Sequence, residues 1–218
     1  MVENKLASNL GRFLGVLLGT IVLTDSVQAS DTVPLDDQRR AHLLTLARID
    51  GRAMTANQLD DRGVLVSFFA SWCPPCNAEL EHVKLLHLDH AAQGLTVITV
   101  NLFEDFTGFA DDGKRLKRFL GRHEPVFSVV RRTDETANLF GGIERLPTVL
   151  VFGRDGRAQF HFVHDKGAKK TNPGMNEPRR AVRNALGGSA AGRSPSLLEP
   201  PEPVKKFSYF RHFVESSR

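Results

Sequence analysis

The chain has 218 residues, an apolar share of 41% and a charged share of 25%, which are ordinary values for a soluble globular protein. This length allows one good core or two small ones, and the composition excludes a disordered chain, a collagen-like repeat and a membrane protein with several spans. The formal net charge is only +4 and the charges are scattered along the chain. No nucleic-acid partner is therefore expected.

Residues 1–29 are typical of a secretory signal peptide. Lys5 and Arg12 supply positive charge, an apolar run follows over residues 13–23, and Val27-Gln28-Ala29 offers a small-residue cleavage site. The run is about half the roughly 20 residues that a spanning helix needs, so cleavage is expected, with retention as an uncleaved anchor as the alternative. In a bacterium with two membranes the protein would be periplasmic. It would contact the membrane only if this segment is retained.

The first part of the exported chain is predicted to lead into a buried strand. Residues 30–42 form a polar lead-in, and residues 43–47 predict a short strand that ends in a turn at Asp50-Gly51. Gly63 then precedes the continuous apolar and β-branched run 64–69, which is typical of a central strand buried on both faces. A helix is expected from about residue 75 to residue 92.

Strands and helices continue to alternate after Gly94. The expected elements are a strand over 95–100, a helix over 111–120, a strand over 126–130, a short helix capped by Thr133, a β-hairpin of strands 148–152 and 159–163 around Asp155-Gly156, and a helix over 177–186. This order predicts one domain over 43–187, an α/β sandwich with a mixed central sheet and flanking helices. Residues 188–218 are expected to be a Pro/Ser/Gly-rich linker followed by an aromatic and basic tail.

The chain's two cysteines, Cys73 and Cys76, are the candidate reactive groups. They follow the predicted central strand directly, so Cys73 is expected at a helix N-terminus, where free N–H groups and the helix dipole favour a thiolate. Cys73 is then the nucleophile and Cys76, one turn further in, is the less exposed resolving thiol. Pro74 and Pro75 are tolerated there because the amides of a first helical turn have no helical acceptor.

A metal site is the main alternative for this cysteine pair. Structural zinc normally needs four ligands, and the sequence has no second cysteine pair. His82, His87 and His90 follow on the same predicted helix without a spacing that directs a pair of them at the thiols. No metal and no other cofactor are therefore expected, and the redox group would be the Cys73–Cys76 disulfide itself.

The stretch from Asp50-Gly51 through Gly63-Val64-Leu65-Val66-Ser67-Phe68-Phe69-Ala70-Ser71-Trp72-Cys73-Pro74-Pro75-Cys76 resembles the TlpA/ResA group of thioredoxin-like proteins. The resemblance continues at Asn77-Ala78-Glu79-Leu80, resumes at Arg145-Leu146-Pro147-Thr148, and covers about residues 43–186. It implies a thioredoxin-like fold and an exported or membrane-tethered thiol–disulfide oxidoreductase, and members of the group are mostly reductants.

The resemblance also implies roles for single residues. Pro147, with Leu146, takes the place of the family's cis-proline loop, which binds the substrate backbone and shields the cysteines. Glu79 would be a proton acceptor near the thiols or, alternatively, only a favourable acid in the first turn of a helix. Trp72 takes the place of an aromatic residue beside the site, and simple packing is the competing interpretation.

Two departures limit the resemblance. Classical thioredoxins carry a buried aspartate six positions before the first cysteine, where this chain has Ser67, whose hydroxyl is no strong base at neutral pH. Proton handling is therefore left to Glu79 or water. The Gly-x-Pro-Glu motif of the cytochrome c maturation subgroup is not matched at Arg145-Leu146-Pro147-Thr148.

The function expected from the sequence is reduction of disulfides in exported client proteins, with a membrane-borne thiol electron donor restoring the dithiol. Within redox chemistry the alternative is an oxidant or isomerase, since the motif does not set the reduction potential. A thiol-based metallochaperone and a scaffold that binds a protein through its C-terminal tail are the non-enzymatic alternatives.

Overall fold

A single five-stranded mixed sheet organises the part of the chain that the computed structural model describes, residues 33–106, 113–164 and 166–187. Its strand order is β3-β2-β1-β4-β5. The central strand β1 (Gly63–Phe69) runs parallel to β2 (Leu95–Asn101), which runs parallel to β3 (Ser128–Arg131). On the other side, β4 (Thr148–Phe152) is antiparallel to both β1 and β5 (Ala158–Phe162). The predicted mixed sheet is confirmed.

The three inner strands are buried on both faces. Every residue of β1, β2 and β4 is buried, whereas β5 alternates between half-buried and exposed positions. Continuous runs such as Val64-Leu65-Val66 need apolar partners above and below the sheet, and each fully buried large side chain contributes about 1.5–3 kcal/mol. Helices on both faces supply those partners.

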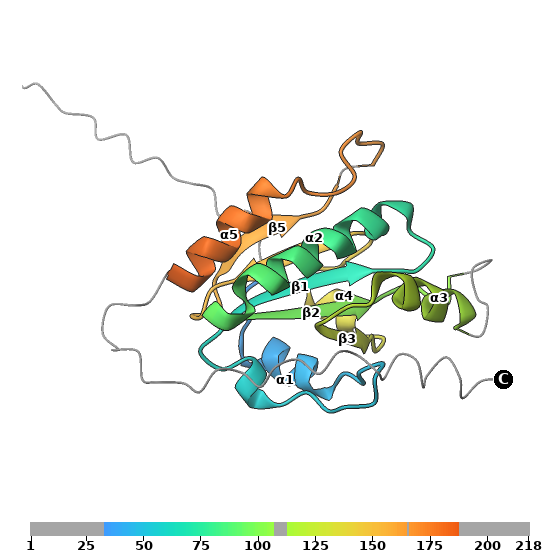
Figure 1. The fold of residues 1–218 in the computed structure, drawn as a ribbon. Coiled ribbons are helices and arrows are strands. Elements are labelled where there is room, and N and C mark those ends of the chain that lie inside the picture. The colour runs from blue at the N-terminus through green and yellow to red at the C-terminus, as the bar shows by residue number, and fades with distance from the viewer. Residues whose placement is uncertain (1–32, 107–112, 165, 188–218) are drawn as a thin grey trace, which may run out of the picture. The chain divides into compact units, whose positions relative to one another are not determined.

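The helices cover the two faces of the sheet. Successive side chains of a strand point to opposite faces, so Phe69, stacked on Phe119, and Phe68, packed against Phe140, identify the covers of the two sides. Phe119 belongs to α3, and Phe140 directly follows α4. Figure 1 shows α2 and α5 crossing the near side of the sheet. The helices are α1 (Asp37–Thr45), α2 (Pro74–His90), α3 (Lys114–His123), α4 (Thr136–Leu139) and α5 (Asn176–Gly187), with short 3₁₀ turns at Ala56–Gln58 and Ala91–Gln93.

The strand predicted over residues 43–47 is wrong, because this stretch ends helix α1, which begins at Asp37 within the expected lead-in. The Asp36 carboxylate caps the helix by accepting a hydrogen bond from the Arg39 N–H at 2.9 Å. Leu43 is fully buried, and His42 Nε2 lies 2.9 Å from Thr136 Oγ1 of α4. The cap and these core contacts outweigh the strand-like local composition.

The remaining predicted strands and helices are present with shifted ends. The helix predicted over 111–120 runs from Lys114 to His123, and residues 111–112 lie outside the described residues. The short helix begins at Thr136, and Thr133 does not cap it but donates its N–H to Thr136 Oγ1. In the β4–β5 hairpin Gly156 has φ +77°, as a tight Asp-Gly turn requires.

The expected signal segment 1–29 and the expected tail 188–218 lie outside the described residues. Within the described part, no helix is long and apolar enough to cross a membrane.

Candidate active site

Cys73 and Cys76 form a disulfide where β1 passes into α2. Cys73 is the N-cap residue of α2, and its N–H donates to the Ala70 carbonyl at 3.2 Å. Cys76 lies in the first turn and donates its N–H to the Cys73 carbonyl at 3.2 Å. The sequence prediction that places Cys73 at a helix N-terminus is confirmed, and the dipole of a 17-residue helix therefore favours negative charge at its sulfur.

Both cysteines are buried in the disulfide form, with 3% of Cys73 and 1% of Cys76 exposed. The small difference has the predicted direction. Pro74 and Pro75 occupy the first two positions of α2, where their missing N–H groups remove no helical hydrogen bond. Pro74 is exposed beside the disulfide, so a client could reach the site from this side.

Glu79 follows Cys76 by three residues on α2, which places both side chains on one face of the helix. Its side chain is 2% exposed, and neither carboxyl oxygen has a hydrogen-bond partner among the described residues. His82 Nδ1 lies 3.8 Å from Glu79 Oε2, too far for a hydrogen bond. Burial raises the pKa of Glu79 from 4.5 to about 8. At neutral pH this acid is therefore mostly protonated.

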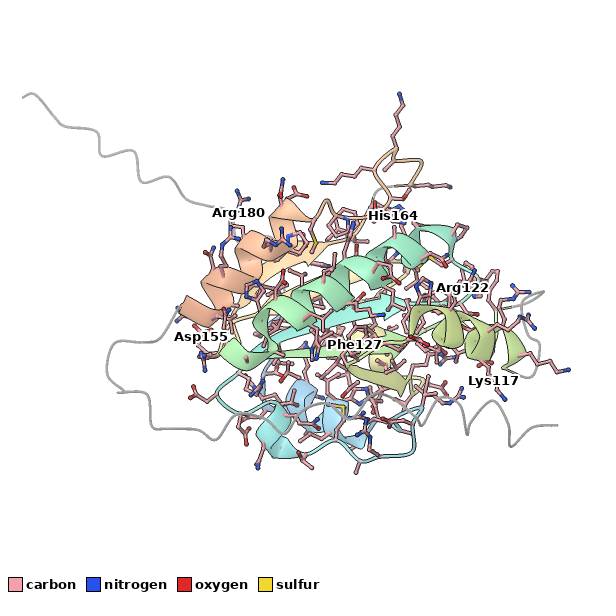
Figure 2. All side chains as sticks on the ribbon, in the orientation of Figure 1. Lys117, Arg122, Phe127, Asp155, His164 and Arg180 are labelled. Atoms are coloured by element: carbon pink, nitrogen blue, oxygen red, sulfur yellow. A yellow bond between two sulfur atoms is a disulfide. The ribbon has the colours of Figure 1, made fainter. Side chains whose placement is uncertain are left out.

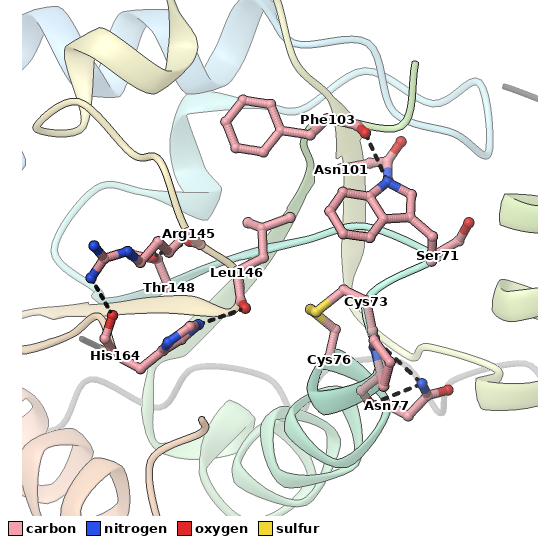
Figure 3. Close-up of a disulfide and its surroundings, with 12 residues drawn as sticks. Ser71, Cys73, Cys76, Asn77, Asn101, Phe103, Arg145, Leu146, Thr148 and His164 are labelled. Atoms are coloured by element: carbon pink, nitrogen blue, oxygen red, sulfur yellow. Dashed lines mark hydrogen bonds between the residues drawn. A yellow bond between two sulfur atoms is a disulfide. The ribbon is translucent and has the colours of Figure 1, made fainter. Parts of the chain in front are cut away.

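The loop before β4 contains a cis peptide bond between Leu146 and Pro147, the isomer that the family resemblance implies. Thr148 pairs with Phe68 in the β1–β4 register, so this loop lies beside the end of β1 that leads into the disulfide (Figure 3). Arg145 Nη1 donates to the His164 carbonyl at 2.9 Å, and His164 Nε2 donates to the Leu146 carbonyl at 3.1 Å. Thr148 Oγ1 donates to the Arg145 carbonyl at 2.8 Å, so the loop is held from β4 and from the segment after β5.

Trp72 directly precedes Cys73 and is half-buried. Its indole Nε1 donates to the Phe103 carbonyl at 2.8 Å, and its ring centroid is 5.9 Å from that of Phe106. A directed hydrogen bond therefore fixes the ring of the residue before Cys73.

Glu104 anchors the segment between β1 and the disulfide. Its carboxylate accepts hydrogen bonds from the Ser71 N–H at 2.9 Å, from the Ser71 hydroxyl and from Asn101 Nδ2 at 2.8 Å. The sequence analysis did not identify Glu104 or Asn101. A usable signal was present, since both polar residues come at the carboxyl end of a parallel strand next to β1.

Ser67 is buried in the middle of β1, between Thr99 of β2 and Val149 of β4. This is the position, six residues before Cys73, at which the sequence has serine in place of the thioredoxin aspartate. Within the described residues, no group of three or more histidine, cysteine, aspartate or glutamate side chains is placed to hold a metal ion. With serine at position 67, the buried acid on the helix of the cysteines is Glu79.

A family model described as Redoxin matches residues 28–177, more than half of the chain. This chain belongs to the redoxin family. Within it, curated relatives named thiol-disulfide oxidoreductase ResA confirm the TlpA/ResA-like resemblance. The protein from Halalkalibacterium halodurans is 29% identical over 114 residues, which cover 51% of this chain and 59% of that relative. The one from Geobacillus thermodenitrificans is 25% identical over 115 residues, covering 52% and 62%. The chain thus spans less than two thirds of the length of these relatives.

Solved structures confirm the thioredoxin-like fold of this redoxin. A thioredoxin-family thiol:disulfide interchange protein from Chlorobium tepidum superposes with a TM-score of 0.52 at 23% identity, covering 64% of this chain and 90% of that one. A secreted disulfide oxidoreductase from Mycobacterium tuberculosis, homologous to DsbE of E. coli, gives a TM-score of 0.53 at 16% identity, covering 68% and 98%. At these identities the likeness concerns the fold alone.

Proposed function

We propose that this protein is an exported thiol–disulfide oxidoreductase that reduces disulfides of client proteins through Cys73 and Cys76. The observation that carries the proposal is the disulfide at the N-terminus of α2, beside the loop of the cis Leu146–Pro147 bond. A structural role explains this bridge poorly, because it closes a loop of only a few residues and removes little entropy from the unfolded chain. The names of the ResA relatives support the same chemistry.

The reaction would proceed by two exchanges from the reduced dithiol. The Cys73 thiolate attacks one sulfur of a client disulfide, so a mixed disulfide forms and the other client sulfur leaves as a thiolate. Cys76, as a thiolate, then attacks Cys73 Sγ, which releases the second client sulfur as a thiolate and closes the Cys73–Cys76 disulfide. The client gains two electrons and the protein loses two.

Glu79 would handle the proton of Cys76. With a pKa of about 8, Glu79 is a carboxylate in a minor fraction of molecules at neutral pH, and this form would take up the proton that Cys76 loses before Cys76 attacks. The neutral acid then fits the buried oxidised site. When a donor thiolate attacks Cys73 Sγ to reduce the protein again, Cys76 leaves as a thiolate and Glu79 can return that proton. Ser67 has no carboxyl to share this task.

The client would lie across the disulfide between two fixed edges. The Leu146–Pro147 loop, fastened through Arg145 and His164, would receive the client backbone on one side. Trp72, with its ring fixed by the Phe103 carbonyl, would flank the client on the other. Pro74 is exposed and Pro75 half-buried between these edges, and they would contact the client next to Cys73.

Export and electron supply complete the proposal. The signal-like residues 1–29 support transfer across the inner membrane into the periplasm, with a retained anchor as the alternative. Because each turnover leaves the disulfide, a membrane-borne thiol electron donor would restore the dithiol. The redox-active disulfide would be the sole cofactor.

Trapping of mixed disulfides tests the exchange chemistry. We expect Cys76→Ala to accumulate covalent adducts between Cys73 and periplasmic clients, since the resolving thiol is gone, and non-reducing electrophoresis would detect them. The matched control Cys73→Ser keeps Cys76 and should give none. Absence of adducts with Cys76→Ala in cells that express the folded protein would refute the proposed function.

A redox titration against glutathione tests the direction of electron flow. We expect a midpoint near that of thioredoxin, about −270 mV, for a protein that reduces clients. A midpoint near about −120 mV would instead assign the protein as an oxidant.

A further inference from the structure

The side chain of Asn77 turns back onto the first turn of α2. Its Nδ2 donates to the Pro74 carbonyl at 3.1 Å and to the Cys73 carbonyl at 3.4 Å (Figure 3). The reversed amide would set Oδ1 against these two carbonyl oxygens, so the contacts define its orientation. Asn77 Oδ1 therefore faces away from the dithiol as a hydrogen-bond acceptor.

His123, the last residue of α3, meets that acceptor. Its Nε2 lies 3.0 Å from Asn77 Oδ1, and its Nδ1 lies 2.6 Å from Glu81 Oε1. An amide oxygen and a carboxylate oxygen both accept hydrogen bonds. A neutral imidazole carries one N–H and satisfies one of the two contacts, whereas an imidazolium satisfies both. The ring of His123 therefore bridges two acceptors, the Asn77 amide oxygen and the Glu81 carboxylate.

The ring is enclosed between α2 and α3. The His123 side chain is 8% exposed, its centroid lies 4.5 Å from that of Phe119, and Lys84 Nζ donates to the His123 carbonyl at 2.7 Å. Figure 2 shows the end of α3, marked by Arg122, beside the N-terminal part of α2. Two charged residues of α2, Glu81 and Lys84, thus contact His123, and Arg122 and Glu124 are its neighbours in the chain.

We propose that His123, held by Glu81, is a positioning residue that acts through Asn77 to stabilise the Cys73 thiolate. This inference rests on Cys73 as the nucleophile of the proposed function. His123 acts through another side chain, without contact to a client.

The physical reason lies in the chain of donors. An imidazole N–H on Asn77 Oδ1 polarises the amide, which strengthens the hydrogen bonds from Nδ2 to the Cys73 and Pro74 carbonyls. These bonds hold the first turn of α2, whose free N–H groups favour negative charge on Cys73 Sγ. When the imidazole is replaced, this support of the first turn is weakened, and the thiolate becomes less favourable.

The thiolate titration of the fully reduced full-length protein tests this inference. His123→Gln removes the ring that bridges Asn77 and Glu81, and we expect the pKa of Cys73 to rise by about one unit. Alkylation of Cys73 by iodoacetamide should then be about tenfold slower below that pKa, because the thiolate fraction falls by that factor. Asn77→Ala should give a shift in the same direction, and Glu81→Gln a smaller one.

His90→Gln is the matched control. His90 is a buried histidine at the far end of α2, with its Nδ1 3.1 Å from Gln93 Oε1, and its loss should leave the Cys73 titration unchanged. An unchanged titration in folded His123→Gln would overturn the inference. A shift in His123→Gln without one in Asn77→Ala would also overturn it, since His123 would then act without Asn77.

If His123→Gln fails to fold, Asn77→Ala and Glu81→Gln decide the outcome, because both change residues on the outer, partly exposed side of α2. Failure of this inference is separate from failure of the proposed function. The adducts expected from Cys76→Ala do not require His123, and the Cys73 titration does not require a client.

Discussion

Two glutamates, Glu79 and Glu104, lie on the two sides of the disulfide in opposite environments. Glu79 sits on α2 behind Cys76, 2% exposed, and neither of its oxygens has a hydrogen-bond partner among the described residues. Glu104 sits after β2, half-buried, and accepts hydrogen bonds from the Ser71 backbone, the Ser71 hydroxyl and Asn101. The same residue type is therefore placed without hydrogen-bond donors at position 79 and with three of them at position 104.

The difference separates a group that can exchange a proton from one that holds structure. A carboxyl without donors in a dry site is more stable as the neutral acid, so the pKa of Glu79 is about 8 and its protonation can change during turnover near neutral pH. A carboxylate that accepts several hydrogen bonds keeps its donors in place. We therefore expect Glu79 to exchange a proton at the site and Glu104 to hold the Ser71 segment in place.

The largest expected effect is the change in the free energy of unfolding that Glu79→Gln causes. Because the pKa of Glu79 in the folded protein lies above its ordinary value of 4.5, the folded state holds this proton more tightly than the unfolded chain. The free energy of unfolding therefore has this contribution in full below about pH 4.5 and loses it as pH rises through about 8. The glutamine side chain of the variant does not titrate. The free energy of unfolding of the oxidised variant, relative to that of wild type, should therefore be higher at pH 9 than at pH 5 by on the order of 4 kcal/mol.

Urea unfolding of both oxidised proteins at pH 5, 7 and 9 measures this margin. Other titrating groups are common to the two proteins and cancel in the difference. Glu104→Gln is the matched control, because a carboxylate surrounded by donors should lose stability on the same change at every pH. An equal margin between Glu79→Gln and wild type at pH 5 and pH 9 would contradict the raised pKa.

The sheet and most of its covers were predictable from the sequence for a physical reason. Runs such as 64–69 and 95–100 are apolar or β-branched at every position except Ser67, which suits strands buried on both faces, and Asp-Gly marks the hairpin turn. Helix α1 was missed because the local run Leu43-Leu44-Thr45-Leu46 has no clear helical period, while its stabilising partners are distant. The hydroxyl of Thr136 is one of them, 94 positions from His42.

The site was predictable to the extent that it lies in one stretch of sequence. Cys73, Cys76 and Glu79 are close in the chain, and the cis bond at Pro147 was implied by the family resemblance. The protonation of Glu79 and the approach of His123 to Asn77 were not, because they depend on how α3 and the sheet pack around α2. No local pattern reveals such contacts.

A smaller effect is expected on the loop side, where Glu104→Ala removes all three hydrogen bonds and leaves the Ser71 N–H and the Asn101 amide unpaired. Unpaired buried donors cost about 1–3 kcal/mol each, and partial access of water lowers the sum, so we expect a loss of about 2–3 kcal/mol in the free energy of unfolding at pH 7. Glu104→Gln keeps one acceptor oxygen and should lose about 1 kcal/mol. The loss in Glu104→Ala should exceed that in Glu104→Gln, because only alanine leaves all the donors without this acceptor. Equal losses in the two variants would mean that these hydrogen bonds do not hold the Ser71 segment, and the division between the two glutamates would not hold.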